Sequence, residues 1–172
     1  MDRLRILVIY YSMEKSTQLV AEAIADATGA ELAELQPLVE PRVKGFARYL
    51  LYGWQRLLHP RMPIAPPSFD PQDYDLIFIG TPVWAFQAAP AVQTLLRIMP
   101  MTGRHVALFC THRGGPGPTL ALMRRALPAA TILGSTELAD VQIDAAAARK
   151  TAAAWAKEIV ASRSHGQEPY TP

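Results

Sequence analysis

The alternation of apolar runs with segments of helical spacing constrains the fold of this chain most strongly. Residues 5–11 and 76–80 are continuous apolar runs rich in β-branched residues, which are typical of strands buried on both faces of a parallel sheet. Further strands are expected at 31–35, 105–111 and 131–138. Helices are expected at 17–27, 92–99, 120–127 and 144–161, with Asp144 as the N-cap of the last one. This order predicts an α/β domain with a right-handed, doubly wound parallel sheet.

The length of 172 residues suits one domain, which we expect over 1–162, followed by a flexible polar tail at 163–172. A long connection at 36–71, bracketed by prolines, interrupts the alternation. A helix within it, over 42–61, has one apolar face and one basic face. This helix either covers the sheet as an ordinary helix or docks on an acidic partner or a membrane surface through Arg42, Arg48 and Arg56.

Composition argues against several classes of function. Half of the residues are hydrophobic and 19% are charged, as in ordinary globular proteins. The net charge of +2 is too small to predict nucleic-acid binding. Cys110 is the single cysteine, so no intrachain disulfide can form, and we expect a cytoplasmic protein in which Cys110 is a core residue. The histidines show no metal-ligand spacing, so no metal is expected.

Three loops at one edge of the sheet are the expected binding site, because ligands of doubly wound sheets bind beyond the carboxyl ends of the strands. The first loop, at 11–17, carries the hydroxyls of Ser12, Ser16 and Thr17 at the start of a helix. Backbone N–H groups and the helix dipole make such a place an anion site, so the loop predicts phosphate binding. The alternative is that Ser16 or Thr17 only caps the helix. The glycine motifs of dinucleotide-binding and P-loop proteins do not follow this strand, nor do the acidic residues that a phosphoacceptor receiver domain needs.

The second and third loops carry a resemblance to a known family. Residues 74–86 read YDLIFIGTPVWAF and precede a helix that opens with Ala89 and Pro90, and residues 108–117 read LFCTHRGGPG. With the first loop, and in this order, they resemble the loops of the flavodoxin family, in particular its short, single-domain FMN oxidoreductases. The resemblance implies a five-stranded parallel sheet of order 2-1-3-4-5, with helices on both faces and FMN held by the three loops.

The FMN-binding positions that the resemblance implies fall in all three loops. The phosphate would lie in the first loop, the ribityl chain and the isoalloxazine ring against the second, and the pyrimidine edge of the ring under the third. These positions are Ser12, Met13, Glu14, Lys15, Ser16, Thr17, Thr81, Pro82, Val83, Trp84, Ala85, Phe86, Thr111, His112, Arg113, Gly114 and Gly115. Trp84 or Phe86 is the expected stacking partner of the ring. The alternative is that either aromatic side chain belongs only to the core.

Two positions depart from the family pattern. The phosphate loop of the family usually reads Thr-Gly-Asn-Thr, whereas this chain has Glu14 and Lys15 before Ser16 and Thr17. A carboxylate near the phosphate weakens binding unless Lys15 offsets its charge. If the glycine position needs a positive φ, a lysine there costs about 1–2 kcal/mol. Related loops commonly carry glycine at the position of Phe86. The side chain of Phe86 would narrow the ring pocket or exclude the flavin.

The charges near the ring edge favour one kind of electron transfer. We expect Arg113 and His112 to face the N1 and C2 edge of the ring as catalytic residues and to raise the reduction potential, because negative charge develops there on reduction. The alternative for Arg113 is a solvated loop charge. A raised potential predicts a two-electron oxidoreductase that takes electrons from NAD(P)H and passes them to a quinone-like or other acceptor.

Other functions and partners stay open at this point. One alternative is a one-electron carrier of the flavodoxin type, and another is a flavin-free binding or scaffold module of the same fold. The expected partner is a redox protein or a small-molecule electron acceptor rather than a nucleic acid. A homodimer is a further option by analogy with other enzymes of this fold.

Overall fold

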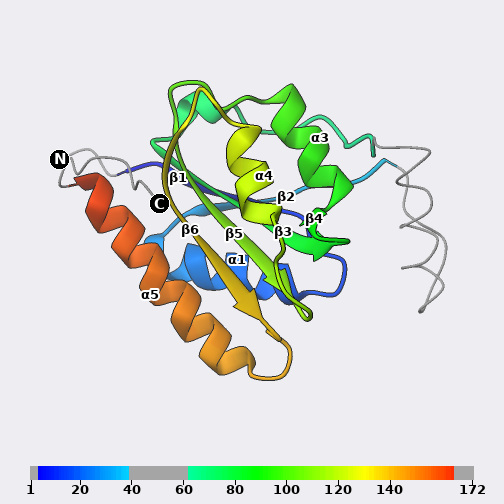
Figure 1. Ribbon diagram of the computed structural model, residues 1–172. Helices are drawn as coiled ribbons and strands as arrows, with labels where there is room; N and C mark the ends of the chain where they lie inside the picture. The colour runs from blue at the N-terminus through cyan, green and yellow to red at the C-terminus, as the bar shows by residue number, and fades with distance from the viewer. Residues whose placement is uncertain (1–3, 39–61, 165–172) are drawn as a thin grey trace.

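The computed structural model describes residues 4–38 and 62–164 (Figure 1). The strands are β1 (Ile6–Tyr10), β2 (Glu31–Glu34), β3 (Leu76–Trp84), β4 (Gln87–Ala88), β5 (His105–His112) and β6 (Thr131–Ala139). The helices are α1 (Ser16–Thr28), α3 (Pro90–Ile98), α4 (Thr119–Arg125) and α5 (Ala145–Ser164), with a 3-10 helix at Pro71–Asp73. The expected basic helix over 42–61 and most of the expected tail at 163–172 lie outside the described residues.

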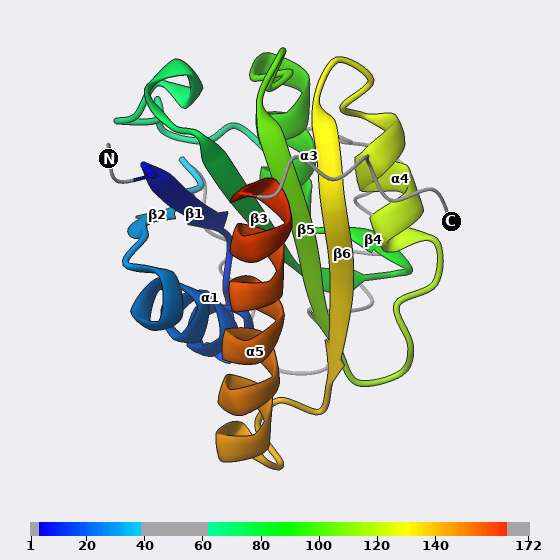
Figure 2. The same cartoon turned by 90° about the vertical axis from the view of Figure 1, so that its left-hand side faces the viewer.

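Five parallel strands form the sheet in the order β2-β1-β3-β5-β6, and β4 pairs with β3 in the antiparallel sense (Figure 2). Counted over the parallel strands alone, this is the predicted order 2-1-3-4-5, so the predicted fold class is confirmed. The register places Tyr10 beside Gly80 and Gly80 beside Phe109. The carboxyl ends of β1, β3 and β5 therefore reach the same edge of the sheet.

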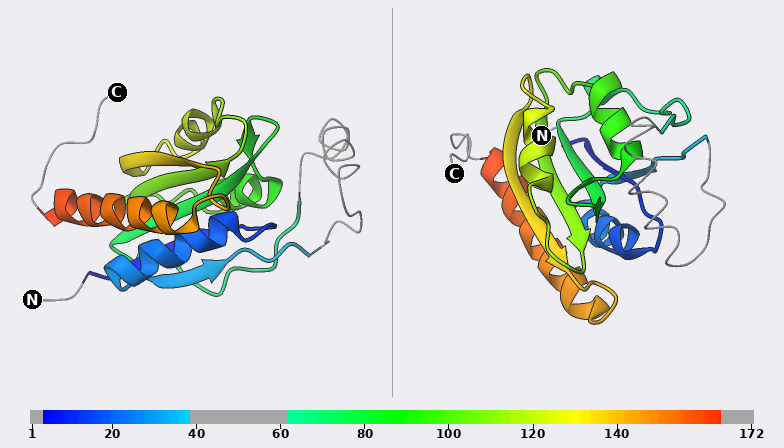
Figure 3. Two further views of the ribbon diagram at one scale, coloured as in Figure 1. Left: turned by 90° about the horizontal axis from the view of Figure 1, so that it is seen from below. Right: turned by 45° about the vertical axis from the view of Figure 1, so that its right-hand side comes forward.

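Helices cover both faces of the sheet (Figure 3). On one face, α1 and α5 bury a cluster that includes Val8, Ile24 and Phe78. On the other face, α3 and α4 contribute Leu95 and Met123 to a second cluster. The sheet interior is thus apolar on both sides, as the continuous hydrophobic strands predict. Within the described residues, no helix combines the length and the hydropathy that crossing a bilayer requires.

Local sequence signals set the ends of two helices. Gly29 follows α1 with a φ of 70°, and its N–H donates to the Ala25 carbonyl, as in a C-terminal glycine cap. Asp144 precedes α5, and its Oδ1 accepts a 2.9 Å hydrogen bond from the Ala147 N–H, which confirms the expected N-cap.

The structure differs from the sequence expectation at the end of the third strand. We expected this strand to end at Gly80, but β3 continues to Trp84. Thr81 and Pro82 pair with β5, and the last two residues pair with β4. The turn of this hairpin is Ala85-Phe86, and both residues have positive φ values, of 47° and 60°. Two-residue hairpin turns of this type usually contain Asn-Gly or Asp-Gly, so no local sequence signal marks this one.

Candidate functional site

The predicted loops meet at the carboxyl edge of the sheet and are joined by hydrogen bonds. The Tyr11 N–H donates to the Gly80 carbonyl over 3.3 Å, which links the loop after β1 to β3. The buried hydroxyls of Thr17 and Thr111 share a hydrogen bond of 2.9 Å between α1 and β5. Loops far apart in the sequence are therefore held together by the chain itself.

The loop after β1 contains a buried hydroxyl with no partner. Ser12 Oγ is inaccessible to solvent, and no group of the described residues hydrogen-bonds to it. A buried polar atom without a partner is costly, so it is usually satisfied by a ligand or by water. The free hydroxyl of Ser12 suits an anion such as a phosphate, which accepts hydrogen bonds.

The start of α1 has no side-chain cap. Lys15 is the N-cap residue, it has the left-handed φ of 64°, and its side chain does not cap the helix. The positive φ that the sequence analysis considered as a condition at this position is therefore present. Thr17 is buried, and its hydroxyl is hydrogen-bonded to Thr111. The N-cap is Lys15, so the alternative that Ser16 or Thr17 caps α1 is wrong. Among residues 4–38 and 62–164, no side chain accepts from the first N–H groups of α1, as an anion site requires.

A polar cluster connects the loop after β1 with the loops after β5 and β6. Arg113 Nη2 donates to Gln142 Oε1 over 3.0 Å and lies 3.9 Å from Glu14 Oε2. Gln142 Nε2 in turn donates to the backbone carbonyl of Glu14. The structure thus places the guanidinium of Arg113 beside Glu14, the carboxylate whose charge Lys15 was considered to offset. That Arg113 faces the edge of the ring stays a prediction.

The end of β3 and the hairpin that follows it form the second wall of the site. The hydroxyl of Thr81 accepts from the Ala89 N–H and donates to the Pro82 carbonyl, each over 2.9 Å, so it fixes the start of α3. The ring of Trp84 meets that of Tyr11 edge to face, with 5.8 Å between the ring centroids. Trp84 is half-buried, whereas Phe86 at the tip of the hairpin is 61% exposed.

The glycine-rich loop after β5 is held by His112. The Gly115 N–H donates to His112 Nδ1 over 3.1 Å, and His112 Nε2 lies 3.9 Å from Glu137 Oε1. A histidine that accepts at Nδ1 carries its proton on Nε2 when neutral. Gly115 itself has a φ of 106°, which a residue with a side chain rarely adopts. His112 therefore orders the loop that we predicted to close over the ring.

Cys110 lies beneath this loop in β5. It is fully buried, and burial raises the pKa of its thiol to about 12. The nearby Glu137 carboxylate contributes to this rise in the pKa. A thiol with so high a pKa is a poor nucleophile, which agrees with the expectation that Cys110 is a core residue.

Sequence reasoning missed one residue of the edge, Gln142. It lies between β6 and α5, in a loop that we did not include in the site. The signal was available, because the last parallel strand also ends at the carboxyl edge. The Asp140 N–H donates to the His112 carbonyl over 2.9 Å and attaches this fourth loop to the third.

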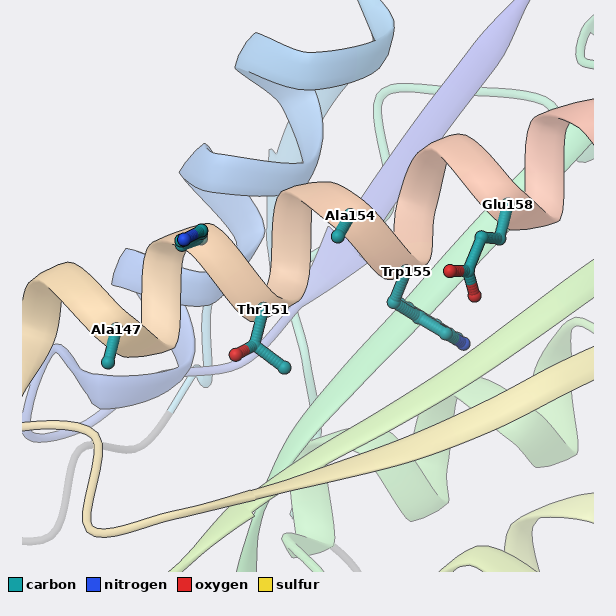
Figure 4. Close-up of a pocket in the computed structure, with 6 residues that line it drawn as sticks. Ala147, Thr151, Ala154, Trp155 and Glu158 are labelled. Atoms are coloured by element: carbon teal, nitrogen blue, oxygen red, sulfur yellow. The ribbon is translucent and has the colours of Figure 1, made fainter.

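A separate hollow lies along α5 (Figure 4). Its lining residues are Ala147, Lys150, Thr151, Ala154, Trp155 and Glu158. All six belong to one helix, and none belongs to the loops after β1, β3 and β5. The hollow is therefore distinct from the predicted site.

Comparisons with known proteins agree with the fold. The model of a family described as flavodoxin matches residues 57–158, which is more than half of the chain. No curated protein matches the sequence.

Solved structures also resemble this chain. A candidate flavoprotein from Bacteroides eggerthii has a TM-score of 0.73 at 22% identity. The matched region covers 91% of this chain and 98% of the flavoprotein chain. A flavoprotein in complex with FMN from Lactobacillus acidophilus has a TM-score of 0.68 at 24% identity, over 83% of this chain and 97% of its own. The two-electron reduced flavodoxin of Megasphaera elsdenii has a TM-score of 0.56 at 17% identity, over 89% and 99% of the two chains. At these identities the similarity concerns the fold.

Proposed function

Because this chain belongs to the flavodoxin family, we propose that it binds one FMN at the carboxyl edge of its sheet and acts in electron transfer. In its finer form, the proposal is a two-electron oxidoreductase that takes electrons from NAD(P)H and passes them to a quinone-like or other acceptor. The FMN complex of the similar Lactobacillus acidophilus flavoprotein supports the choice of cofactor.

The observation that carries the cofactor proposal is the buried, unpartnered hydroxyl of Ser12. It lies in the same loop as Lys15, whose left-handed φ precedes the uncapped start of α1. Hydroxyl and amide donors of this kind fit a phosphate group, which has only acceptors to offer when ionised. A neutral ligand would accept fewer hydrogen bonds from these donors.

The residues of the other loops would hold the rest of the cofactor. The half-buried ring of Trp84 would lie against the isoalloxazine ring, and the loop at Gly114 and Gly115 would close over its pyrimidine edge. When bound, FMN supplies the uptake and release of electrons. The chain's own contribution is to orient the ring and to set the charge around it.

The local charges support a two-electron oxidoreductase more than a strongly reducing carrier. Lys15 and Arg113 bring two positive charges to the loops after β1 and β5, and Glu14 is the one acidic residue of these two loops. Positive charge favours the reduced cofactor and raises the reduction potential. The proximity of Glu14 to Arg113 reduces this effect, so we propose a moderate rise.

A flavin titration tests the cofactor proposal. We expect FMN to bind to the apo-protein, and Ser12→Ala to weaken FMN binding about tenfold, the value of one hydrogen bond to a charged group. Riboflavin, which lacks the phosphate, should bind both proteins equally. Ser68→Ala, at an exposed position outside the loops, is the control. Equal loss of FMN and riboflavin in Ser12→Ala would contradict the phosphate assignment.

The electron donor is tested separately. We expect anaerobic NADH or NADPH to bleach the flavin absorbance of the loaded protein, and a quinone to restore it. Potentiometric titration should give a lower potential for Arg113→Ala than for the unchanged protein. Failure of both nicotinamides to reduce a flavin that dithionite reduces would favour the one-electron carrier.

One observation favours the flavin-free binding module. The tip of the β3–β4 hairpin lies against the loop after β5, so that a Cβ added to Gly117 would be 2.8 Å from Phe86 Cβ. The hairpin thus reaches across part of the region where the ring is expected. If FMN binds only after Phe86→Gly, this second function is the correct one.

A further inference from the structure

We infer that Gln142 is a positioning residue for the phosphate subsite, because its side-chain amide fixes the orientation of the peptide that joins Glu14 to Lys15. The inference rests on the proposed function and adds to it a residue from a fourth loop. It proceeds from the hydrogen bonds of Gln142 and from the backbone conformation of Lys15.

The side-chain amide of Gln142 bridges two loops. Its Nε2 donates to the Glu14 carbonyl, and its Oε1 accepts from Arg113 Nη2 over 3.0 Å. The arginine has only donors to offer, so it selects the orientation in which the amide oxygen faces Arg113 and the amide nitrogen faces Glu14. Arg113 therefore orients Gln142, and Gln142 in turn binds the loop after β1.

The bond from Gln142 determines where the next N–H points. The Glu14 carbonyl and the Lys15 N–H belong to one trans peptide, so they point in opposite directions. Holding the carbonyl toward Gln142 therefore turns the Lys15 N–H away from Gln142. No residue in the described part of the chain accepts a hydrogen bond from this N–H. It is a donor available to an anion at the start of α1.

The conformation of Lys15 explains why this peptide needs an external hydrogen bond. A φ of 64° costs a residue with a side chain about 1–2 kcal/mol, and glycine adopts it at almost no cost. Rotation about φ of Lys15 is the motion that turns the peptide before it. Without the bond from Gln142, the loop would relax toward negative φ, and the Lys15 N–H would change direction. Gln142 thus takes over a role that a glycine at position 15 would fill by itself.

A double-mutant cycle between positions 142 and 15 tests the inference. Gln142→Met keeps the size of the side chain but removes both hydrogen bonds. In the chain with Lys15, we expect it to raise the FMN dissociation constant about tenfold. In the Lys15→Gly background, where the left-handed conformation is unstrained, we expect a rise of no more than about twofold. The riboflavin dissociation constant should change in neither background, because riboflavin lacks the phosphate.

The controls separate positioning from general loop damage. Ile143→Ala alters the neighbouring residue, which is 83% exposed, and should leave FMN binding unchanged. The unfolding midpoints of the four apo-proteins of the cycle give a second measure that needs no flavin. Gln142→Met should lower the unfolding midpoint more in the chain with Lys15 than in the chain that carries Lys15→Gly.

The outcomes distinguish failure of the positioning role from failure of FMN binding itself. If the unchanged protein binds FMN but the losses at positions 142 and 15 simply add, the positioning role is wrong and the proposed function stands. An equal loss of riboflavin and FMN in Gln142→Met would also overturn the positioning role. If the unchanged protein binds no FMN, the proposed function fails, and the inference about its phosphate subsite fails with it.

Discussion

The loop after β1 and the β3–β4 hairpin both hold residues with side chains at positive φ, but the two turns are stabilised in different ways. Lys15, after β1, is held from outside by the hydrogen bond that Gln142, in the loop after β6, donates to the Glu14 carbonyl. Ala85 and Phe86 are held by their own hairpin, in which β3 and β4 pair on both sides of the turn. The first turn therefore depends on distant residues, and the second depends on local pairing and on the contact of its tip with Gly117.

The two kinds of support determine which turn can respond to a ligand. A conformation fixed by side chains of other loops is easily shifted when those side chains change partners, whereas a two-residue hairpin turn keeps its shape as long as its strands pair. We therefore expect the phosphate loop to be the adjustable part of the edge and the hairpin to be the rigid part. Four substitutions test this comparison.

The largest effect is expected at the contact of the hairpin tip. Gly117→Ala should destabilise the protein by about 2–3 kcal/mol, because Gly117 has a φ of 52° and the new Cβ would lie 2.8 Å from Phe86 Cβ. Relief of that contact requires a shift of the hairpin backbone rather than rotation of a side chain. Urea unfolding measures the loss.

Gly103→Ala is the matched control for this substitution. Gly103 has a φ of 71°, but no atom lies within 4 Å of the position of an added Cβ. It should therefore cost only the conformational part, about 1–2 kcal/mol. If the two substitutions are equally costly, the tip of the hairpin is not rigid.

A second change removes the strain of the hairpin turn itself. Replacing Ala85-Phe86 by Asn-Gly should stabilise the protein by about 1–2 kcal/mol, because this pair adopts two consecutive positive φ values at little cost. The thermal unfolding midpoint measures the gain. Phe86→Ala, which removes the ring but keeps the conformational cost, should show no such gain. A loss of stability on introducing Asn-Gly would mean that packing of Phe86, rather than strand pairing, holds the turn.

The strands and helices of this chain could be predicted from its sequence because each depends on a local pattern. The run of residues 76–80 is apolar throughout, and the sheet buries it on both faces. The extension of β3 through Val83 and Trp84 could not be predicted, because it depends on pairing with a two-residue strand across a turn without glycine or asparagine.

The site was predictable to the extent that it follows from topology. The edge of the sheet and its three loops follow from the parallel strand order. The partner of Arg113 does not, because Glu14, Arg113 and Gln142 are far apart in the sequence and meet only once the loops have folded together. A requirement for positive φ at position 15 could be anticipated, but the hydrogen bond that sustains it could not.

A third, smaller effect concerns the phosphate loop. Lys15→Gly should stabilise the apo-protein by about 1 kcal/mol, because glycine adopts the left-handed conformation without steric cost. Lys15→Ala keeps this cost and removes the charge, so it should leave stability nearly unchanged. Comparison of the two variants by urea unfolding separates conformation from charge. A gain of similar size in both variants would show that the lysine charge, and not its φ, is what destabilises the loop.

The smallest effect on stability is expected at Arg113, whose side chain is 70% exposed. Arg113→Leu should change the free energy of unfolding by less than about 0.5 kcal/mol, because exposed ion pairs contribute little.

The effect of Arg113→Leu on FMN binding should be larger, at several-fold, since the substitution removes a positive charge and leaves Gln142 without its orienting donor. In the Glu14→Gln background the loss should shrink, because no carboxylate then remains to oppose the phosphate. Raising the ionic strength should reduce the loss in the chain with Glu14, and Arg125→Leu on α4 is the control. The loss of FMN affinity could instead be insensitive to salt and equal in the Glu14 and Glu14→Gln backgrounds. Arg113 would then act only through Gln142. The phosphate loop would then be adjusted by hydrogen bonding rather than by charge.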